Sequence, residues 1–180
     1  MLFKSTVRVL PVLTLFLLLG ASHTAFANDQ AKLALAKTMV FETEQKVSPY
    51  ATPDLKKLLR KAHQIDQRES KRIGGDIACE FFESTYLGAG DDGPGVITNW
   101  KAGVTKSGMV RATFHKDSNS TSNDTSGHLI EFDMTCRGQK CLVDDVRIAS
   151  NWESATLPQR TQYSLRKDAQ AIVNANGCGV

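Results

Sequence analysis

The stretch LIEFDMTCRGQKCLVDDVRI, residues 129–148, decides the fold class of this chain. Apolar and polar residues alternate in its first half, and a second apolar segment begins at Leu142. The RGQK run between them, residues 137–140, is polar and contains a glycine, which is typical of a hairpin turn. We therefore predict two antiparallel strands, with Cys136 and Cys141 facing each other across the hairpin.

The same alternation occurs upstream of this hairpin. Residues 97–102 and 110–115 each alternate with a period of two, and Lys-Ser-Gly at 106–108 supplies a turn between them. Residues 117–127 are mostly Asp, Ser, Asn and Thr, and we expect a long exposed loop there. The second half of the chain thus predicts a meander of antiparallel strands.

Helical periodicity lies on both sides of these strands. We predict an amphipathic helix over residues 31–46 and a second one from Thr52 to Arg68, which opens with a hydroxyl cap, a proline and an acid. A last helix is expected from Gln162 to Ala175, ended by Asn176 or Gly177. The predicted class is α+β, with N-terminal helices packed on one face of a curved antiparallel sheet and a C-terminal helix.

The first residues predict an export signal. Lys4 and Arg8 precede an apolar run over residues 9–19, and Ala25 and Ala27 are small residues at the positions that a signal peptidase reads. We expect cleavage of residues 1–27 and a mature single domain over residues 28–180. The alternative is a retained membrane anchor, but the apolar run is shorter than the roughly 20 residues that span a bilayer. No stable membrane insertion is therefore expected after cleavage.

The charge balance argues against an anionic polymer as partner. The whole chain has a net charge of +3, from 22 basic and 19 acidic residues, and loss of Lys4 and Arg8 lowers it to about +1. The densest basic segment, residues 56–61, lies on the polar side of a predicted helix and is interpreted as a solvated face. We predict no nucleic-acid partner.

Four cysteines lie downstream of the signal: Cys79, Cys136, Cys141 and Cys178. An even number in an exported chain favours disulfides, and three pairings are possible. The hairpin pairing of Cys136 with Cys141 leaves Cys79 with Cys178. A zinc site is the competing interpretation, but the chain has no CxxC pair and no histidine at finger spacing.

Two pairs of adjacent carboxylates are the features closest to a catalytic motif. They are Asp91 with Asp92 and Asp144 with Asp145. Adjacent strand residues point to opposite faces, so Asp144 and Asp145 are not expected to form a dyad; one is expected to pair with Arg147 or to cap a loop. No complete catalytic set is identified, and we predict a protein that is not an enzyme.

Metal and cofactor motifs are also missing from the sequence. His63, His115 and His128 are scattered and are interpreted as surface or structural residues. Residues 88–95 are rich in glycine but lack the lysine of a phosphate loop, so a flexible loop is expected. We predict no metal and no cofactor.

Several segments together resemble a group of bacterial periplasmic proteins of unknown function in the nuclear transport factor 2-like superfamily. The resemblance covers roughly residues 50–173. It implies a cone-shaped fold, in which helices pack against a bent antiparallel sheet, and a periplasmic location. The chain departs from the pattern at Cys141, where an aromatic residue is common, and in the polar insertion at 117–127. The segments are YATPDLKKLL at 50–59, GDD at 90–92, the strand around Trp100, CLVDDVRI at 141–148 and SLRKDAQAI at 164–172.

The first functional hypothesis is a non-enzymatic binding protein. Export, small size and the lack of a catalytic set favour an inhibitor or immunity protein that neutralises a cell-envelope toxin, such as a secreted wall-degrading effector, and the resemblance adds that related cone folds occur among immunity proteins. Rigid protruding elements suit such a role because they lose little entropy on binding. The candidate contact residues lie in two polar loops: Asp91, Asp92, Ser118, Asn119, Asn123 and Asp124.

Two other functions stay open. The first is a small-molecule binder or enzyme that uses the interior of the fold, with Tyr50, Trp100 and Asp145 lining the pocket. The second is an accessory protein of a resident envelope complex. A deep pocket with convergent polar groups favours the former.

Overall fold

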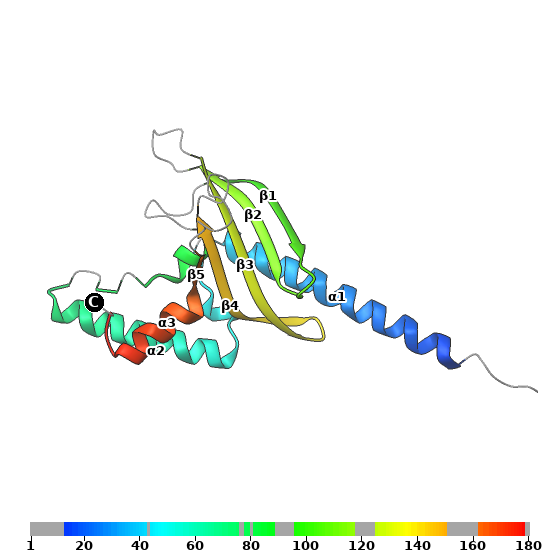
Figure 1. Cartoon of the computed structure of the whole chain (residues 1–180), viewed down its shortest axis with the longest axis horizontal. Helices are drawn as coiled ribbons and strands as arrows, with labels where there is room; N and C mark the ends of the chain where they lie inside the picture. The colour runs from blue at the N-terminus through cyan, green and yellow to red at the C-terminus, as the bar shows by residue number, and fades with distance from the viewer. Residues whose placement is uncertain are drawn as a thin grey trace, which may run out of the picture.

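The structure, a computed structural model, describes residues 13–42, 44–75, 78–79, 81–88, 96–117, 125–150 and 162–178 (Figure 1). Its α+β class agrees with the prediction. The elements in chain order are α1 (Leu13–Phe41), η1 (Ser48–Tyr50), α2 (Pro53–Arg72), η2 (Glu83–Leu87), β1 (Val96–Val104), β2 (Val110–Asp117), β3 (Thr125–Arg137), β4 (Lys140–Ser150), β5 (Gln162–Ser164) and α3 (Leu165–Ala175).

The strands form one antiparallel sheet in sequence order, β1-β2-β3-β4-β5. The predicted β3–β4 hairpin is confirmed: Cys136 is opposite Cys141, and Arg137 is opposite Lys140. Gly138 has a φ of 60°, in the left-handed region, and Gln139 does not. This combination is typical of a two-residue type II′ turn, in which glycine takes the first central position.

Two details of the strands differ from the prediction. The expected loop at 117–127 is shorter, because Asp117 pairs with Thr125 and Lys116 with Ser126. Backbone pairing between β2 and β3 therefore extends into this polar run. The alternation in β1 is broken by a bulge between Thr98 and Lys101, where Asn99 has a φ of 55°.

The first helix differs from the prediction at both ends. α1 begins at Leu13 rather than Ala31 and ends at Phe41 rather than Lys46. Gln45 accounts for the early end: its φ is 42°, and its side-chain amide donates a hydrogen bond to the Val40 carbonyl at 2.7 Å. This bond satisfies one of the carbonyls that a helix end leaves without an intrahelical partner.

The starts of the other two helices follow sequence signals. Thr52 caps α2 and accepts a hydrogen bond from the Leu55 N–H, as predicted, and the helix continues to Arg72. α3 ends at Asn176, which has a φ of 50°, also as predicted. The start of α3 differs from the prediction of Gln162: residues 162–164 are strand β5, and Ser164 is the helix cap.

The core lies between α1 and the sheet, and α2 and α3 pack against each other beside β4 (Figure 1). Its largest fully buried side chains come from all of these layers: Phe114, Phe132, Met39, Leu55, Leu59, Leu87, Ile130 and Leu165. Burying apolar area of this kind is the main favourable term in folding. Within the described residues, no helix combines the length and apolar character needed to cross a membrane.

Candidate functional site

The six predicted contact residues lie outside the described residues. Asp91 and Asp92 fall in the segment 89–95, and Ser118, Asn119, Asn123 and Asp124 fall in the segment 118–124. These positions stay predictions.

Trp100, a predicted pocket residue, packs between two other rings. Its ring meets Phe41 of α1 edge-on with centroids 5.4 Å apart, and it meets Phe114 of β2 at 5.8 Å. Aromatic pairs at these separations add stability beyond their buried area. The half-buried indole therefore joins α1 to the sheet.

Tyr50 contacts the same end of α1. Its hydroxyl donates a hydrogen bond to Glu42, the residue after Phe41. This hydrogen bond, together with burial, raises the pKa of the Tyr50 hydroxyl. The structure therefore brings Tyr50 and Trp100 to adjacent residues of one helix end.

Asp145, the third predicted pocket residue, lies on the face of the sheet opposite to the core, where its carboxylate accepts several hydrogen bonds. In β4 a bulge makes Asp144 an extra residue without a partner in β3. Val146, the residue after Asp145, faces the core. The buried Asp145 carboxylate accepts hydrogen bonds from the Ser164 hydroxyl at 2.9 Å, the Arg166 N–H at 3.0 Å and the Arg147 guanidinium at 3.2 Å. The expected pairing with Arg147 is confirmed, and Asp145 fixes the start of α3.

Asp144 likewise binds the residue that caps α2. Its carboxylate accepts hydrogen bonds from the Thr52 hydroxyl at 2.9 Å and from the Arg166 guanidinium at 2.5 Å. The bulge therefore lets two adjacent acids bind residues at the starts of two helices. Structural partners bind both carboxylates.

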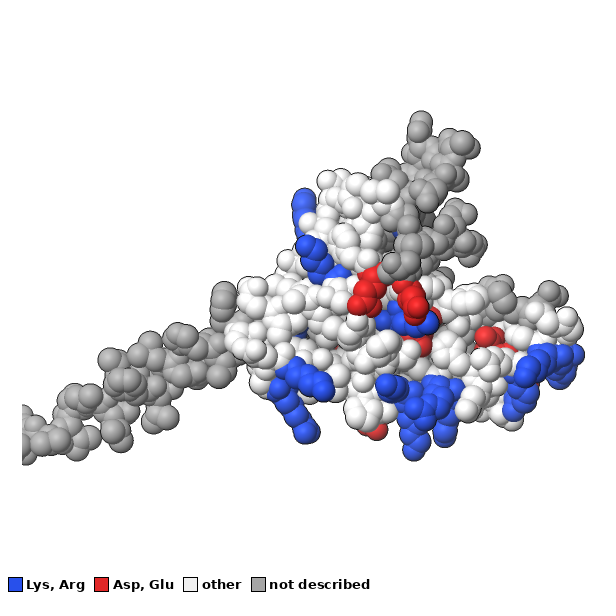
Figure 2. Space-filling model, turned by 180° about the vertical axis from the view of Figure 1, so that it is seen from behind, with Lys and Arg blue, Asp and Glu red and all other residues white. Residues whose placement is uncertain are grey.

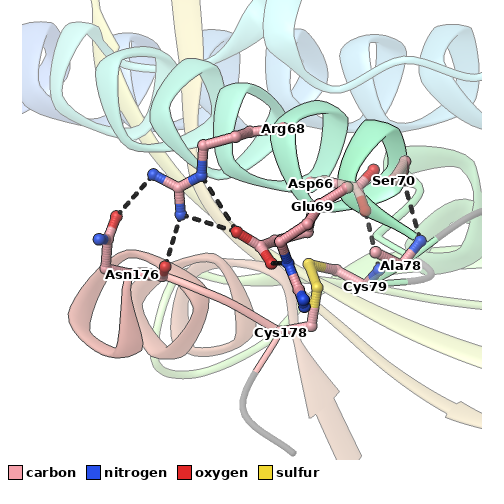
Figure 3. The surroundings of a disulfide bond; sticks show 9 residues. Asp66, Arg68, Glu69, Ser70, Ala78, Cys79, Asn176 and Cys178 are labelled. Carbon is pink, nitrogen blue, oxygen red and sulfur yellow. Dashed lines mark hydrogen bonds and ion pairs between the residues drawn. A yellow bond between two sulfur atoms is a disulfide. The ribbon is translucent and has the colours of Figure 1, made fainter. Parts of the chain in front are cut away.

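A cleft of about 410 Å³ lies beside the disulfide between Cys79 and Cys178. Figure 3 shows the residues around this disulfide. The disulfide joins residues 99 positions apart, and the Asp66 carboxylate accepts the Cys79 N–H at 2.8 Å. Arg68 donates to the Asn176 carbonyl at 2.6 Å, which ties the end of α3 to α2. The cleft is lined by Glu69, Arg72, Ile73, Ala78, Ala175, Gly177 and Cys178.

The same region holds a group of three potential metal-ligating residues. One ligand atom each from Asp66, Cys79 and Cys178 lies within 4.8 Å of the others. Both sulfur atoms are in the disulfide, and only a thiolate is a metal ligand. The group therefore offers one carboxylate and no thiolate in the oxidised protein.

A second cleft, of about 180 Å³, lies beside the buried carboxylate of Glu83. Glu83 accepts hydrogen bonds from the Val47 N–H at 2.8 Å and the Ser48 N–H at 2.7 Å, and it contacts Nε2 of the half-exposed His63 at 2.9 Å. Burial acts to raise the pKa of Glu83, but the hydrogen bonds from His63 and Ser48 outweigh it and hold that pKa below its ordinary value. The volume is below the roughly 300 Å³ at which ligand pockets begin. We interpret Glu83 as a structural link between η2, α2 and residues 47–48.

His115 and His128 are on adjacent strands, β2 and β3. His128 of β3 stacks on Phe114 with ring centroids 5.2 Å apart. Burial, followed by the charges of Lys116 and His115, lowers the pKa of His128 to about 4. His128 is therefore uncharged at neutral pH.

The disulfide-closed end of the β3–β4 hairpin has an exposed tip. β2 pairs with β3 only as far as Phe132, and Ala51 bridges β4 at Val143. Beyond these contacts a two-stranded ribbon continues to the turn, and the disulfide between Cys136 and Cys141 crosses it. We call residues 135–142 the hairpin end.

Two positively charged side chains lie at the tip of this hairpin end. Arg137 and Lys140 are exposed and directly opposite each other, with exposed Gly138 and Gln139 between them. Within the described part of the chain, no carboxylate forms an ion pair with either cation. The sequence predicts only a turn at these residues. The cysteine-flanked run CRGQKC, which contains two basic residues and no acid, is the sequence signal that indicates a charged tip.

Both disulfide pairings inferred from the sequence are confirmed. Disulfides form and persist in oxidising compartments, which indicates an extracellular or periplasmic environment. Comparison of the chain with family models, with curated proteins and with solved structures found no match.

Proposed function

We propose that this chain is an exported, non-enzymatic binding protein of the periplasm: an inhibitor or immunity protein that neutralises a cell-envelope-targeting toxin. The observation that carries the proposal is the hairpin end, a ribbon closed by the disulfide between Cys136 and Cys141, whose tip from Arg137 to Lys140 is exposed. An element that is already ordered loses little conformational entropy when a partner binds it.

The disulfide has a local role at this position. Its two cysteines are only 5 positions apart, so it restricts the unfolded chain less than a bridge over a long loop. An isolated two-stranded hairpin is marginally stable in water. The bridge therefore holds a segment that projects beyond the rest of the sheet, which suits a binding element.

The packing of the core favours a surface function over an interior pocket. On the side of the sheet that faces α1, Ile130, Phe132 and Phe114 are almost fully buried, as is Met39 of α1. Protein interiors are packed about as densely as organic crystals, so such side chains fill the space a ligand would need.

Capture followed by a wall-degradation assay tests the proposal. The full-length chain, with its own signal and a C-terminal tag, is expressed in its source, and the stoichiometric partner is identified by mass spectrometry. We expect an envelope-degrading enzyme whose activity on purified peptidoglycan falls when the chain is added. Recovery of a resident envelope complex with undiminished enzyme activity supports an accessory protein instead.

A second candidate function is small-molecule binding in the cleft beside Cys178. Its volume of about 410 Å³ is within the range of ligand pockets, and Glu69 and Arg72 supply charged groups at its wall. A metabolite screen by thermal shift tests it, with Arg72→Ala as the variant that should lose any stabilisation observed. Stabilisation that survives this substitution contradicts binding at this cleft.

A further inference from the structure

The tip of the hairpin end carries a charge arrangement that stability does not explain. Arg137 and Lys140 are a directly opposed cross-strand pair, and like charges in that position destabilise a sheet. Among the described residues, no acid offsets them. Residues 135–142 contain two cations and no acid, so their charge is +2.

The shape of the hairpin end suits a cleft better than a flat surface. Its two strands are about 5 Å apart, and the four steps along the chain from Met134 to Gly138 extend about 13 Å. The tip residues from Arg137 to Lys140 are all exposed. A narrow ribbon of this length places its two cations ahead of the rest of the sheet.

The two cations emerge from opposed positions of one narrow tip, which favours a partner with closely placed anionic groups. Opposed residues of an antiparallel pair have Cα atoms about 4.5–5.5 Å apart. Enzymes that hydrolyse glycosidic bonds place two catalytic carboxyl groups about 5–9.5 Å apart across an open cleft. Arginine binds carboxylates in a bidentate manner, and lysine acts as a point charge. The tip therefore matches a paired-carboxylate cleft in charge.

We propose that Arg137 and Lys140 enter the catalytic cleft of a wall-glycan hydrolase and bind its two carboxylates. This inference rests on the proposed inhibitor function and adds the contact residues and the class of target. The partner is an enzyme that cleaves the glycan strands by paired-carboxylate catalysis, rather than a zinc-dependent amidase or a peptidase. The hairpin end blocks the substrate and neutralises the carboxylates that the reaction needs.

The test uses charge reversal with a matched control. The variant Arg137→Glu/Lys140→Glu is compared with Lys56→Glu/Arg60→Glu on α2, where the residues are exposed and have no ion pair with a described residue. Figure 2 shows basic side chains gathered over this region of the molecule. Both variants change the net charge by the same amount, so a general charge effect acts on both alike.

The probe is the glycan hydrolase captured with the tagged full chain, assayed on purified peptidoglycan, with lysozyme as a reference. We expect the hairpin variant to weaken inhibition at least 100-fold, about tenfold for each charge, and the α2 variant less than threefold. Wild-type affinity should fall as salt rises, and this dependence should diminish in the hairpin variant. Circular dichroism and the thermal midpoint confirm that both variants fold.

Each other outcome points to a different failure. If a glycan hydrolase is inhibited equally by wild type and hairpin variant, the hairpin contact is wrong and the inhibitor function stands. If the captured and inhibited enzyme is an amidase or a peptidase, the class of target is wrong. If wild type captures and inhibits no wall-degrading enzyme, the inhibitor function fails and this inference fails with it.

Discussion

The Asp145 carboxylate accepts two contacts from the Ser164 hydroxyl, at 2.9 and 3.1 Å, while the Ser164 oxygen accepts the Lys167 N–H at 3.1 Å. The Ser164 hydroxyl therefore donates a hydrogen bond to Asp145 of β4 and at the same time accepts one from the first turn of α3. Through this one residue, β4 determines where α3 begins.

Asp145→Ala should destabilise the protein by about 2–4 kcal/mol, because it leaves the Arg147 guanidinium and the Ser164 hydroxyl without a buried acceptor. Urea denaturation followed by circular dichroism measures the change. Asp144→Ala is the control: the Asp144 side chain is 43% exposed, so we expect a loss of about 1 kcal/mol or less. Equal losses for the two variants contradict the assignment of Asp145 as the anchor of α3.

The two disulfides should differ in their contribution to stability. In the chain-entropy model, a loop of about 100 residues contributes about 4.7 kcal/mol and a loop of 5 residues about 2 kcal/mol. Cys79→Ser/Cys178→Ser should therefore lower the free energy of unfolding more than Cys136→Ser/Cys141→Ser, whose bridge spans 5 positions rather than 99. Guanidinium denaturation without reductant measures both. A larger loss from the short bridge contradicts this ranking.

Local signals in the sequence predicted much of the fold. The Thr52 cap, the turn at 137–140 and the end of α3 at Asn176 depend on residues close in the chain. The Asp144 bulge and strand β5 depend on how β4 pairs with β3 and β5. The periodicity of apolar residues along the sequence does not encode such pairing or its register shifts.

The candidate site was predictable only in part. The pairing of Cys136 with Cys141 followed from the turn between them. The exposure of Arg137 and Lys140 depends instead on how far the neighbouring segments, such as β2, extend along the hairpin. β2 begins opposite Phe132, and this pairing is made by residues about 20 positions apart. A single sequence shows the charged turn without showing that it projects beyond its neighbours.

Gly88→Ala should be more destabilising than Gly108→Ala, although the two glycines have similar φ angles of 79° and 83°. Alanine at either position carries the cost of a left-handed backbone, about 1–2 kcal/mol. At Gly88 the added Cβ also meets the Phe114 ring at 2.8 Å, whereas at Gly108 its nearest neighbour is the Lys32 amine at 3.7 Å. Thermal and urea unfolding of both variants measure the difference, and equal losses show that the ring moves aside without cost.

Glu83 should make stability depend on pH in the acid range. Its pKa is lowered in the folded protein, so the unfolded chain binds the proton more readily and acid favours unfolding. The contribution of Glu83 is fully present above its unfolded value of about 4.5 and is lost as the pH falls through the folded value. Glu83→Gln should lower stability at neutral pH and reduce the dependence of stability on pH below about 4.5.

Urea denaturation of wild type and variant at a series of pH values measures this effect. The difference between the two curves isolates Glu83, because His128, whose pKa is lowered to about 4, titrates in both proteins. Glu44→Gln is the control: the Glu44 carboxylate is exposed, and a hydrogen bond from Lys46 lowers its pKa, so solvent screens the pair and the wild-type pH profile should persist. Parallel curves for wild type and Glu83→Gln below pH 4.5 would mean that the bonds of Glu83 to His63 and Ser48 do not depend on its charge.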